Sequence, residues 1–140
     1  MDHNTLTGTI PYRLGFLADV EAIYLDNNQL TGTIPSMIGN LDDIKELKLN
    51  NNKLSGPIPS ELGTCFRLDS FNLEHNQLTG EIPTQLGKLD TLVNFRMFDN
   101  SFEGITMPLE VCGLVKNEVL TFLAADCTSK MACECCHKCF

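Results

Sequence analysis

A fixed spacing between equivalent residues runs through most of this chain and limits the folds that it can adopt. Apolar residues suited to the end of a short strand recur at equal intervals, at Leu25, Leu49, Leu73 and Met97. An asparagine shortly after each of them keeps the same interval, at Asn28, Asn52, Asn76 and Asn100. Because one such unit cannot bury its own apolar side, neighbouring units must stack, so the spacing predicts a solenoid.

The repeated string L-x-x-N-x-L-[TS]-G-x-I-P-x-x-[LI]-G resembles the plant-type leucine-rich repeat of receptor-kinase ectodomains and polygalacturonase inhibitors. The resemblance implies an α/β solenoid, a right-handed coil with a parallel β-sheet on its concave face and short 3-10 or irregular segments on its convex face. It also implies a second sheet near each Gly-x-Ile-Pro segment. We therefore expect leucine-rich repeats over residues 1–106 and a cysteine-rich C-terminal cap over residues 107–140.

The asparagine column is predicted to be a structural ladder and not a binding site. An amide side chain carries donors and an acceptor, so stacked Asn28, Asn52, Asn76 and Asn100 can bind backbone groups of adjacent turns. Cys65 stands in a leucine column. A free cysteine there usually behaves as a small buried apolar side chain, and a reactive thiol is the alternative.

The last turn is expected to shift its register after Gly104, because the segment that follows has one residue more than in the preceding turns. With this longer step Leu120 would follow Phe95, so residues 120–124 are predicted as the last strand. Ala125 would then stand where the next ladder asparagine is expected, and the ladder would end there.

Six of the seven cysteines lie near the C-terminal end, at Cys112, Cys127, Cys133, Cys135, Cys136 and Cys139. A terminal repeat needs a different end to shield its last turn, and small extracellular segments commonly use disulfides for this purpose. We predict a disulfide-bonded cap whose connectivity stays open. A metal cluster that includes His137 is the alternative, but the two separated ligand pairs of most zinc sites are missing, so no metal is expected. This tail also resembles the ends of diatom leucine-rich repeat proteins, which implies secretion or the extracellular part of a membrane-anchored protein.

Charge and hydropathy argue against several classes of function. A net charge of −8 disfavours nucleic acid, whose phosphates need a basic face. No apolar tract approaches the roughly 18 to 20 residues of a membrane span. Met1 leads directly into the repeat without a signal peptide, so a mature or cropped fragment is expected. His3, His75 and His137 form no catalytic constellation, and we expect neither enzymatic activity nor a cofactor.

Strand alternation sends the leucines inward and the intervening residues outward. The expected outward columns are Tyr24, Lys48, Asn72, Arg96 and Thr121, and then Asp26, Asn50, Glu74, Phe98 and Leu123. Exposed aromatic and arginine side chains are enriched among interface anchors. We therefore predict that this surface binds an extracellular protein or peptide ligand through the first four residues of each column.

Three alternatives accompany this prediction. Ice binding is suggested by a column of hydroxyl residues, Thr7, Thr31, Ser55 and Thr79. A second row beside it begins with Thr9 and Thr33 but is interrupted by Pro57 and Glu81. The chain could instead be a structural spacer in a longer receptor-like ectodomain. The first turn is also expected to leave Leu6, Ile10, Leu14 and Leu17 facing water, which favours self-association.

Overall fold

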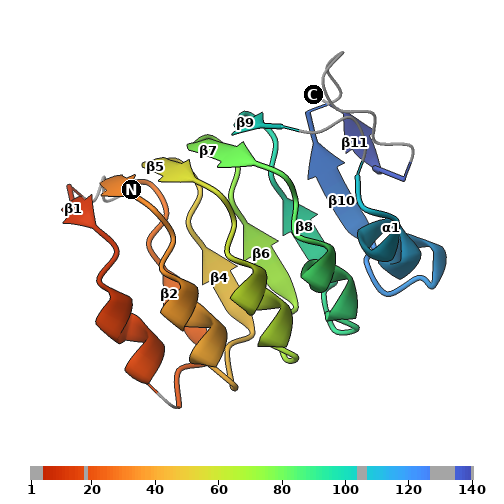
Figure 1. Ribbon diagram of the computed structural model, residues 1–140, viewed down its shortest axis with the longest axis horizontal. Helices are drawn as coiled ribbons and strands as arrows, with labels where there is room; N and C mark the ends of the chain where they lie inside the picture. Colours follow the sequence, from red (N-terminus) through yellow and green to blue (C-terminus); the bar gives the residue numbers. More distant parts are fainter. Residues whose placement is uncertain (1–4, 18, 104–106, 127–134, 140) are drawn as a thin grey trace.

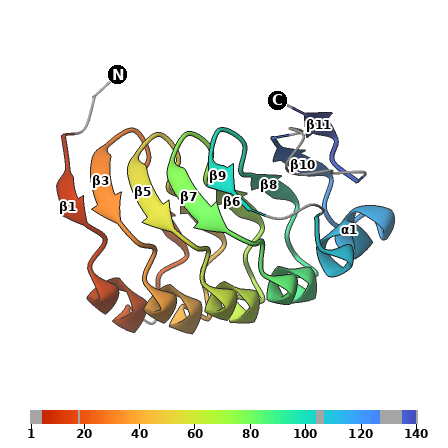
Figure 2. The same cartoon turned by 45° about the horizontal axis from the view of Figure 1, so that its top comes forward.

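The computed structural model describes residues 5–17, 19–103, 107–126 and 135–139. Strands and 3-10 helices follow one another in a repeating order, and the chain winds as a solenoid (Figure 1). Two sheets form two sides of the coil, and the helices lie along a third side (Figure 2). The predicted solenoid of parallel strands with short 3-10 segments is therefore confirmed.

The main sheet has six parallel strands in the order β11-β10-β8-β6-β4-β2. These strands are β2 (Ala22–Tyr24), β4 (Glu46–Lys48), β6 (Ser70–Asn72), β8 (Asn94–Arg96), β10 (Phe122–Ala125) and β11 (Lys138–Cys139). From β2 to β8 each residue lies opposite its repeat equivalent in the next turn, such as Leu47 opposite Phe71. Equivalent side chains of successive turns therefore stand in straight columns on this sheet.

The second sheet has five parallel strands in the order β1-β3-β5-β7-β9. These strands are β1 (Thr7–Thr9), β3 (Gln29–Gly32), β5 (Lys53–Gly56), β7 (Gln77–Gly80) and β9 (Ser101–Phe102). Here Thr31 lies opposite Lys53, although its repeat equivalent in the next turn is Ser55. Thr9 lies opposite Thr31 with the same displacement. The hydroxyl column expected from the sequence is therefore a diagonal and not a straight row.

Four 3-10 helices begin directly after the proline of the Ile-Pro pair. They are η1 (Tyr12–Phe16), η2 (Ser36–Asn40), η3 (Ser60–Thr64) and η4 (Thr84–Lys88). Proline has a fixed φ and no backbone N–H that would need an acceptor. Both properties suit the residue that precedes a first helical turn. The helices stack closely, since a Cβ on Gly39 would lie 2.4 Å from the Glu61 carbonyl oxygen. In the last turn the helix α1 (Leu109–Lys116) takes this place and packs against η4.

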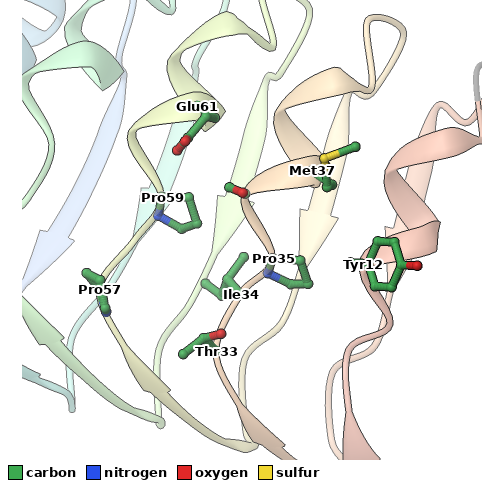
Figure 3. A pocket seen from close by; sticks show the side chains of 9 residues that line it. Tyr12, Thr33, Ile34, Pro35, Met37, Pro57, Pro59 and Glu61 are labelled. Atoms are coloured by element: carbon green, nitrogen blue, oxygen red, sulfur yellow. The ribbon is translucent and has the colours of Figure 1, made fainter.

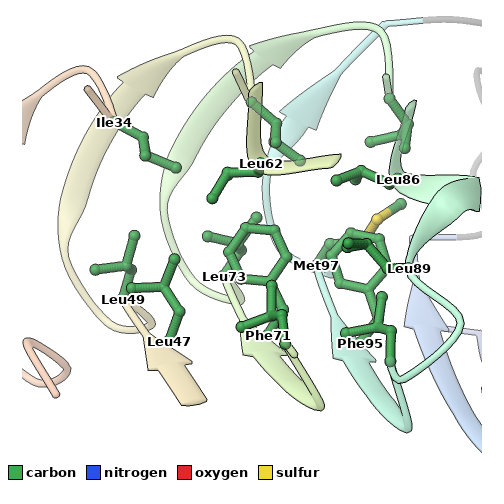
Figure 4. Close-up of a cluster of buried hydrophobic side chains, with 14 of the residues drawn as sticks. Ile34, Leu47, Leu49, Leu62, Phe71, Leu73, Leu86, Leu89, Phe95 and Met97 are labelled. Atoms are coloured by element: carbon green, nitrogen blue, oxygen red, sulfur yellow. The ribbon is translucent and has the colours of Figure 1, made fainter. Parts of the chain in front are cut away.

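The core is one continuous column of aliphatic and aromatic side chains between the two sheets and the helices (Figure 4). Phe71 and Phe95 stack with ring centroids 5.3 Å apart and planes 2° from parallel. Cys65 is fully buried in its leucine column, and its Sγ donates to the Ile38 carbonyl oxygen at 3.6 Å. Burial raises the pKa of this thiol to about 11, which makes it a packing residue and not a reactive one.

Each asparagine of the ladder joins two turns. Asn52 accepts from the Leu30 N–H at 2.9 Å and donates to the Leu25 carbonyl at 2.8 Å and to its own turn at Leu49. Asn76 and Asn100 repeat this pattern one and two turns later. Buried backbone groups at the strand ends are satisfied in this way, which an apolar side chain could not do.

The predicted register of the last turn was wrong. Leu123, and not Leu120, lies opposite Phe95, because α1 lengthens this turn by more than the sequence suggested. Ala125 is fully buried and does not stand at a ladder position. The Asp126 carboxylate accepts from the backbone N–H groups of Asp99 at 2.8 Å and Asn100 at 3.2 Å, whose equivalents in the preceding turns donate to backbone carbonyls.

One disulfide of the predicted cap joins Cys112 of α1 to Cys135, with Cα atoms 5.5 Å apart. Cys136 is also disulfide-bonded. Of the other predicted cap cysteines, Cys127 and Cys133 lie outside the described residues, and so does the side chain of Cys139. The boundary between residues 106 and 107 stays a prediction.

His137 lies immediately before β11, beside Leu123 of β10. Its backbone N–H donates to the Leu123 carbonyl at 2.9 Å, and its Nδ1 accepts from the Leu123 N–H at 3.2 Å. This hydrogen bond occupies one of the two ring nitrogens through which a histidine can bind a metal. Within the ranges that the structure describes, no group of three or more histidine, cysteine or acidic side chains is placed to hold a metal ion.

Candidate ligand-binding face

We define the main-sheet face as the outward side chains of β2, β4, β6, β8 and β10 and one residue after each strand. This added residue lies two positions after each of the first four strands and directly after β10. The strand register arranges these residues in three columns. They are Ala22, Glu46, Ser70, Asn94 and Phe122; then Tyr24, Lys48, Asn72, Arg96 and Ala124; then Asp26, Asn50, Glu74, Phe98 and Asp126.

The sequence analysis did not predict the first column. Its residues lie two positions before those of the Tyr24 column, so the same alternation along each strand would have identified them. The predicted fifth members of the other two columns were wrong. Leu123 is fully buried because it points inward opposite Phe95. Thr121 precedes β10, and its hydroxyl donates to the Val93 carbonyl at 3.2 Å. The sequence shift caused by α1 accounts for both errors.

The N-terminal half of the face is built around Tyr24, whose side chain is 55% exposed. Lys48 Nζ lies 4.5 Å from the centre of the Tyr24 ring and 2.9 Å from Glu46 Oε2. The hydrogen bond to Lys48, and then that to Tyr24, lowers the pKa of Glu46. The same Glu46 hydrogen bonds raise the pKa of Tyr24 and of Lys48. These three side chains therefore form a paired, preorganised unit.

The C-terminal half is built around Arg96. Its guanidinium carbon lies 5.0 Å from the centre of the Phe122 ring, and its Nε donates to Asn94 Oδ1 at 3.4 Å. Asn94 in turn donates to Ser70 Oγ at 3.3 Å and to Asn72 Oδ1 at 3.4 Å. This arrangement holds the arginine against an aromatic ring.

The rim of the face beyond the strands contains Glu74, Phe98, His75 and Asp99. His75 Nδ1 lies 2.6 Å from Asp99 Oδ2, and the His75 ring meets the Phe98 ring edge to face at 5.1 Å. Glu74 was predicted as an outward residue, but it is only 6% exposed. Among the described residues its Oε2 has no hydrogen-bond partner. Burial is the main cause that raises the pKa of Glu74, and a hydrogen bond from its own backbone N–H to the carboxylate opposes this rise.

The remaining predicted residues of this column, Asp26 and Asn50, are half-buried like Phe98. Asp26 Oδ2 accepts from Asn27 Nδ2 at 2.6 Å. All eight predicted binding residues thus lie on one face, but they differ in what a ligand would meet: paired charges on the first two strands, and a buried carboxylate oxygen without a donor just after β6 in the middle of the sheet.

A separate groove of about 500 Å³ lies on the other side of the coil, between the second sheet and the first helices (Figure 3). Its walls are mainly apolar and include the rings of Tyr12, Pro35 and Pro59, with Glu61 at one end. Few polar groups converge in it, so it offers less orientation to a ligand than the main-sheet face does.

None of the helices in the described part of the chain is long and apolar enough to cross a membrane.

Comparisons with known proteins agree with this geometry. The family model described as "Leucine rich repeat" matches residues 18–78. A search of curated proteins found no match. Among solved structures, the chain is similar to the leucine-rich repeat ectodomain of the plant membrane receptor kinase GASSHO1/SCHENGEN3 from Arabidopsis thaliana, in complex with CASPARIAN STRIP INTEGRITY FACTOR 2. That match has 34% identity and a TM-score of 0.80, and covers 93% of this chain and 15% of the other.

Two further structures show the range of similar proteins. The BIR3–SERK2 complex from Arabidopsis thaliana contains a chain with 31% identity and a TM-score of 0.73, over 91% of this chain and 68% of that one. A plant ice-binding protein has 28% identity and a TM-score of 0.77, over 94% of this chain and 41% of that one. The chain spans only 15% and 16% of the length of the first two similar structures. With its repeat spacing, its two parallel sheets and these matches, the chain belongs to the leucine-rich repeat family in its plant-type form.

Proposed function

We propose that this chain is a non-catalytic, extracellular recognition module that binds a protein or peptide through the main-sheet face. The observation that carries the proposal is the arrangement of Tyr24 and Arg96, an exposed aromatic ring and a guanidinium in one column of the same sheet, on β2 and β8. Each takes part in a cation–ring contact, with Lys48 and Phe122 respectively. Tyrosine and arginine are among the side chains most enriched at positions that dominate binding energy.

The preorganisation of these side chains supports the proposal. Ordering a flexible side chain on binding costs about 0.5 to 1.5 kcal/mol. Lys48 is already held by Glu46, and Arg96 by Asn94 and Phe122. A ligand would therefore meet side chains that have lost part of this freedom, which favours affinity. Solved ectodomains similar to this chain were determined in complex with a peptide hormone or a named partner.

A matched pair of double variants tests this function. Tyr24→Ala with Arg96→Ala removes both anchors, and Tyr12→Ala with Arg67→Ala removes the same residue types from the helix side. Tyr12 is 54% exposed and Tyr24 is 55% exposed, so the two tyrosine changes are closely comparable. The probe is a displayed library of random peptides selected on the wild-type protein. We expect the selected peptides to lose at least about 100-fold in affinity for the first variant, since two anchors worth roughly 2 kcal/mol each are removed.

The control variant should keep wild-type affinity for the same peptides, and both variants should keep the wild-type melting temperature within a few degrees. A library that yields no enriched peptide on the wild-type protein would contradict the proposal and favour the spacer interpretation. Equal losses in both double variants would also contradict it, because binding would then not depend on the main-sheet face.

Ice binding is the second candidate, and the similarity to a plant ice-binding protein favours it. Thr9 and Thr31 lie opposite each other on the second sheet, but Lys53 takes the next place in that row. Thr79 lies opposite Ser101, further along the sheet. The staggered register thus interrupts the flat hydroxyl rows that the sequence suggested. Thermal hysteresis of the purified protein, reduced by Thr31→Tyr, would support ice binding.

Self-association through the first turn is a further proposal, since Leu6 and Leu17 are 51% and 46% exposed. Ile10, which was also expected to face water, is buried, and Leu14 is partly buried against the core. The association would therefore use fewer apolar side chains than the sequence predicted.

A further inference from the structure

Glu74 differs from every other carboxylate in the three columns of the main-sheet face. Asp26 accepts from Asn27 Nδ2, Glu46 is paired with Lys48, and Asp126 accepts from two backbone N–H groups. Glu74 Oε2 is buried and meets no donor in the part of the chain that the structure describes. A buried acceptor without a donor is costly, so such a group calls for an explanation.

The side chain lies on the ligand side of the sheet. Leu73, immediately before it, is fully buried in the core, and alternation then directs Glu74 outward with Asn72. The backbone keeps the sheet register here, because the Asn51 N–H donates to the Glu74 carbonyl at 3.0 Å and the His75 N–H to the Phe98 carbonyl at 3.1 Å. The carboxylate is therefore under the surface of the main-sheet face and not inside the solenoid core.

The cation nearest in the columns does not neutralise it. The positive charge of Arg96 lowers the pKa of Glu74 and so opposes the effect of burial. Among the described residues, however, Arg96 and Glu74 form no ion pair within 4.0 Å. The Arg96 guanidinium is instead held by Phe122 and Asn94. His75 is likewise directed to Asp99. The protein thus holds its own cations away from this carboxylate.

We propose that Glu74 is a specificity residue of the main-sheet face and accepts a cationic nitrogen donor of the ligand, an ammonium or guanidinium group of a peptide. This inference rests on the proposed function. An ammonium or guanidinium supplies both the missing hydrogen-bond donor and the opposite charge, and hydrogen bonds between ionised groups are the strong ones. A neutral or acidic ligand group would leave the buried oxygen unpaired or add repulsion, so the site selects for positive charge.

For a ligand cation to reach this carboxylate the Glu74 side chain must turn outward, and its Oε2 has no hydrogen bond to break within the described structure. The Phe98 ring, half-buried in the next place of the same column, offers an aromatic surface beside the incoming cation. The Asp26 charge, which raises the Glu74 pKa further, adds to the negative potential of this column.

The test compares Glu74→Gln with Glu81→Gln, two near-isosteric changes, the second of an exposed carboxylate directly after β7 of the second sheet and outside the main-sheet face. Random peptides are selected on the wild-type protein and on each variant, with free and with acetylated amino termini. We expect lysine or arginine to be enriched at one peptide position on the wild-type protein and on Glu81→Gln, and not on Glu74→Gln. Replacing that basic residue by norleucine should cost about 30-fold in affinity on the wild-type protein and less than about 3-fold on Glu74→Gln.

The outcomes separate this inference from the proposed function. Peptides that are enriched on the wild-type protein but show no basic preference, or the same preference on Glu74→Gln, would overturn the inference alone. Loss of peptide binding on acetylation would assign the cation to the peptide amino terminus, and binding that survives acetylation would assign it to a side chain. Failure to enrich any peptide would remove the proposed function, and the inference with it.

A measurement on the free protein gives an independent check. Because burial raises the folded-state pKa of Glu74, its deprotonation destabilises the fold as pH rises from its unfolded pKa through its folded pKa. Glu74→Gln should therefore raise the melting temperature at neutral pH by a few degrees, and this gain should vanish below the unfolded pKa of a glutamate. Glu46→Gln should not raise it, since its carboxylate has partners. An unchanged or lower melting temperature for Glu74→Gln at neutral pH would mean that the carboxylate already has a donor, and would overturn the inference.

Discussion

The first and last turns of the solenoid differ in how far their apolar side chains are buried. Leu17 is 46% exposed, whereas Leu41 and Leu89, its equivalents one and three turns later, are fully buried. At the other end Leu123 and Ala125 are fully buried, and α1 and β11 lie against the preceding turn. A repeat residue is therefore core or surface according to its neighbour and not according to its own turn.

The difference shows what a terminal turn needs in order to close the stack. A turn inside the solenoid both accepts hydrogen bonds from a neighbouring turn and donates hydrogen bonds to it, as the Asn52 side chain does. A closing turn needs only to accept, and the Asp126 carboxylate does so for two backbone N–H groups at once. Stability in such arrays is approximately a sum of turn and interface contributions, so changes at the two ends should have unequal effects.

The largest contrast is expected between Leu41→Ala and Leu17→Ala. The first creates a cavity in the core and should lower the free energy of unfolding by about 2 to 5 kcal/mol. The second truncates a half-exposed side chain and should cost less than about 1 kcal/mol. Urea denaturation followed by circular dichroism measures both. Similar costs would show that the first turn is packed as tightly in solution as the interior turns.

Opening the C-terminal disulfide should have the next largest effect. Cys112 and Cys135 are separated by 23 positions in the sequence, and a closed loop of this size contributes about 3 kcal/mol in the chain-entropy description. The double variant Cys112→Ala with Cys135→Ala should lose about that much stability, and limited proteolysis should then cut first near β11. Cys65→Ala is the control, because it removes a buried thiol without opening a loop. Cleavage that begins in the first turn instead would contradict the assigned role of the disulfide.

Removing the Asp126 carboxylate should have a smaller effect. Asp126→Ala leaves the Asp99 and Asn100 N–H groups without their acceptor and should cost about 2 kcal/mol. Asp126→Asn retains one acceptor oxygen and should cost about half as much. Asp90→Ala, an exposed change on the helix side, should be neutral within about 0.5 kcal/mol. Amide exchange of Asp99 and Asn100 reports the effect directly, and unchanged exchange in Asp126→Ala would contradict it.

The interior of the fold was predictable because each residue type there has one role that recurs in every turn. The leucine columns, the ladder asparagines and the prolines before the helices follow from this spacing alone. The register of the last turn was not predictable. The helix α1 makes this turn longer, but the amino-acid composition of the segment does not reveal by how many residues. Counting one extra residue therefore placed Leu120 where the structure places Leu123. The stagger of the second sheet was hidden for a related reason, since a register that differs from the sequence repeat leaves no trace in it.

The binding face was predictable as a set of columns but not in its electrostatics. Alternation alone placed Tyr24, Lys48 and Arg96 on one surface. It could not reveal that Glu74 is buried while Glu46, on the same face, is paired. Burial of a polar side chain depends on the size of neighbours in other turns and on local backbone direction, which a pattern of one residue type does not encode.

The smallest effect on stability is expected from polar changes at the first turn, and these changes test its self-association. Leu6→Gln with Leu17→Gln replaces side chains that are about half exposed, so stability should change by less than about 0.5 kcal/mol for each. If two copies associate through this end, the exposed leucines become buried between them, and open strand edges such as β1 and β2 can pair. Sedimentation velocity over a range of concentrations should then show a dimer for the wild-type protein and a monomer for the double variant. Hydrogen exchange of residues 7–17 should slow with concentration in the wild-type protein only, while the interior strands β4 and β6 should not change. A wild-type protein that is monomeric throughout, with exchange in the first turn independent of concentration, would show that this end stays open to solvent at no cost to the rest of the stack.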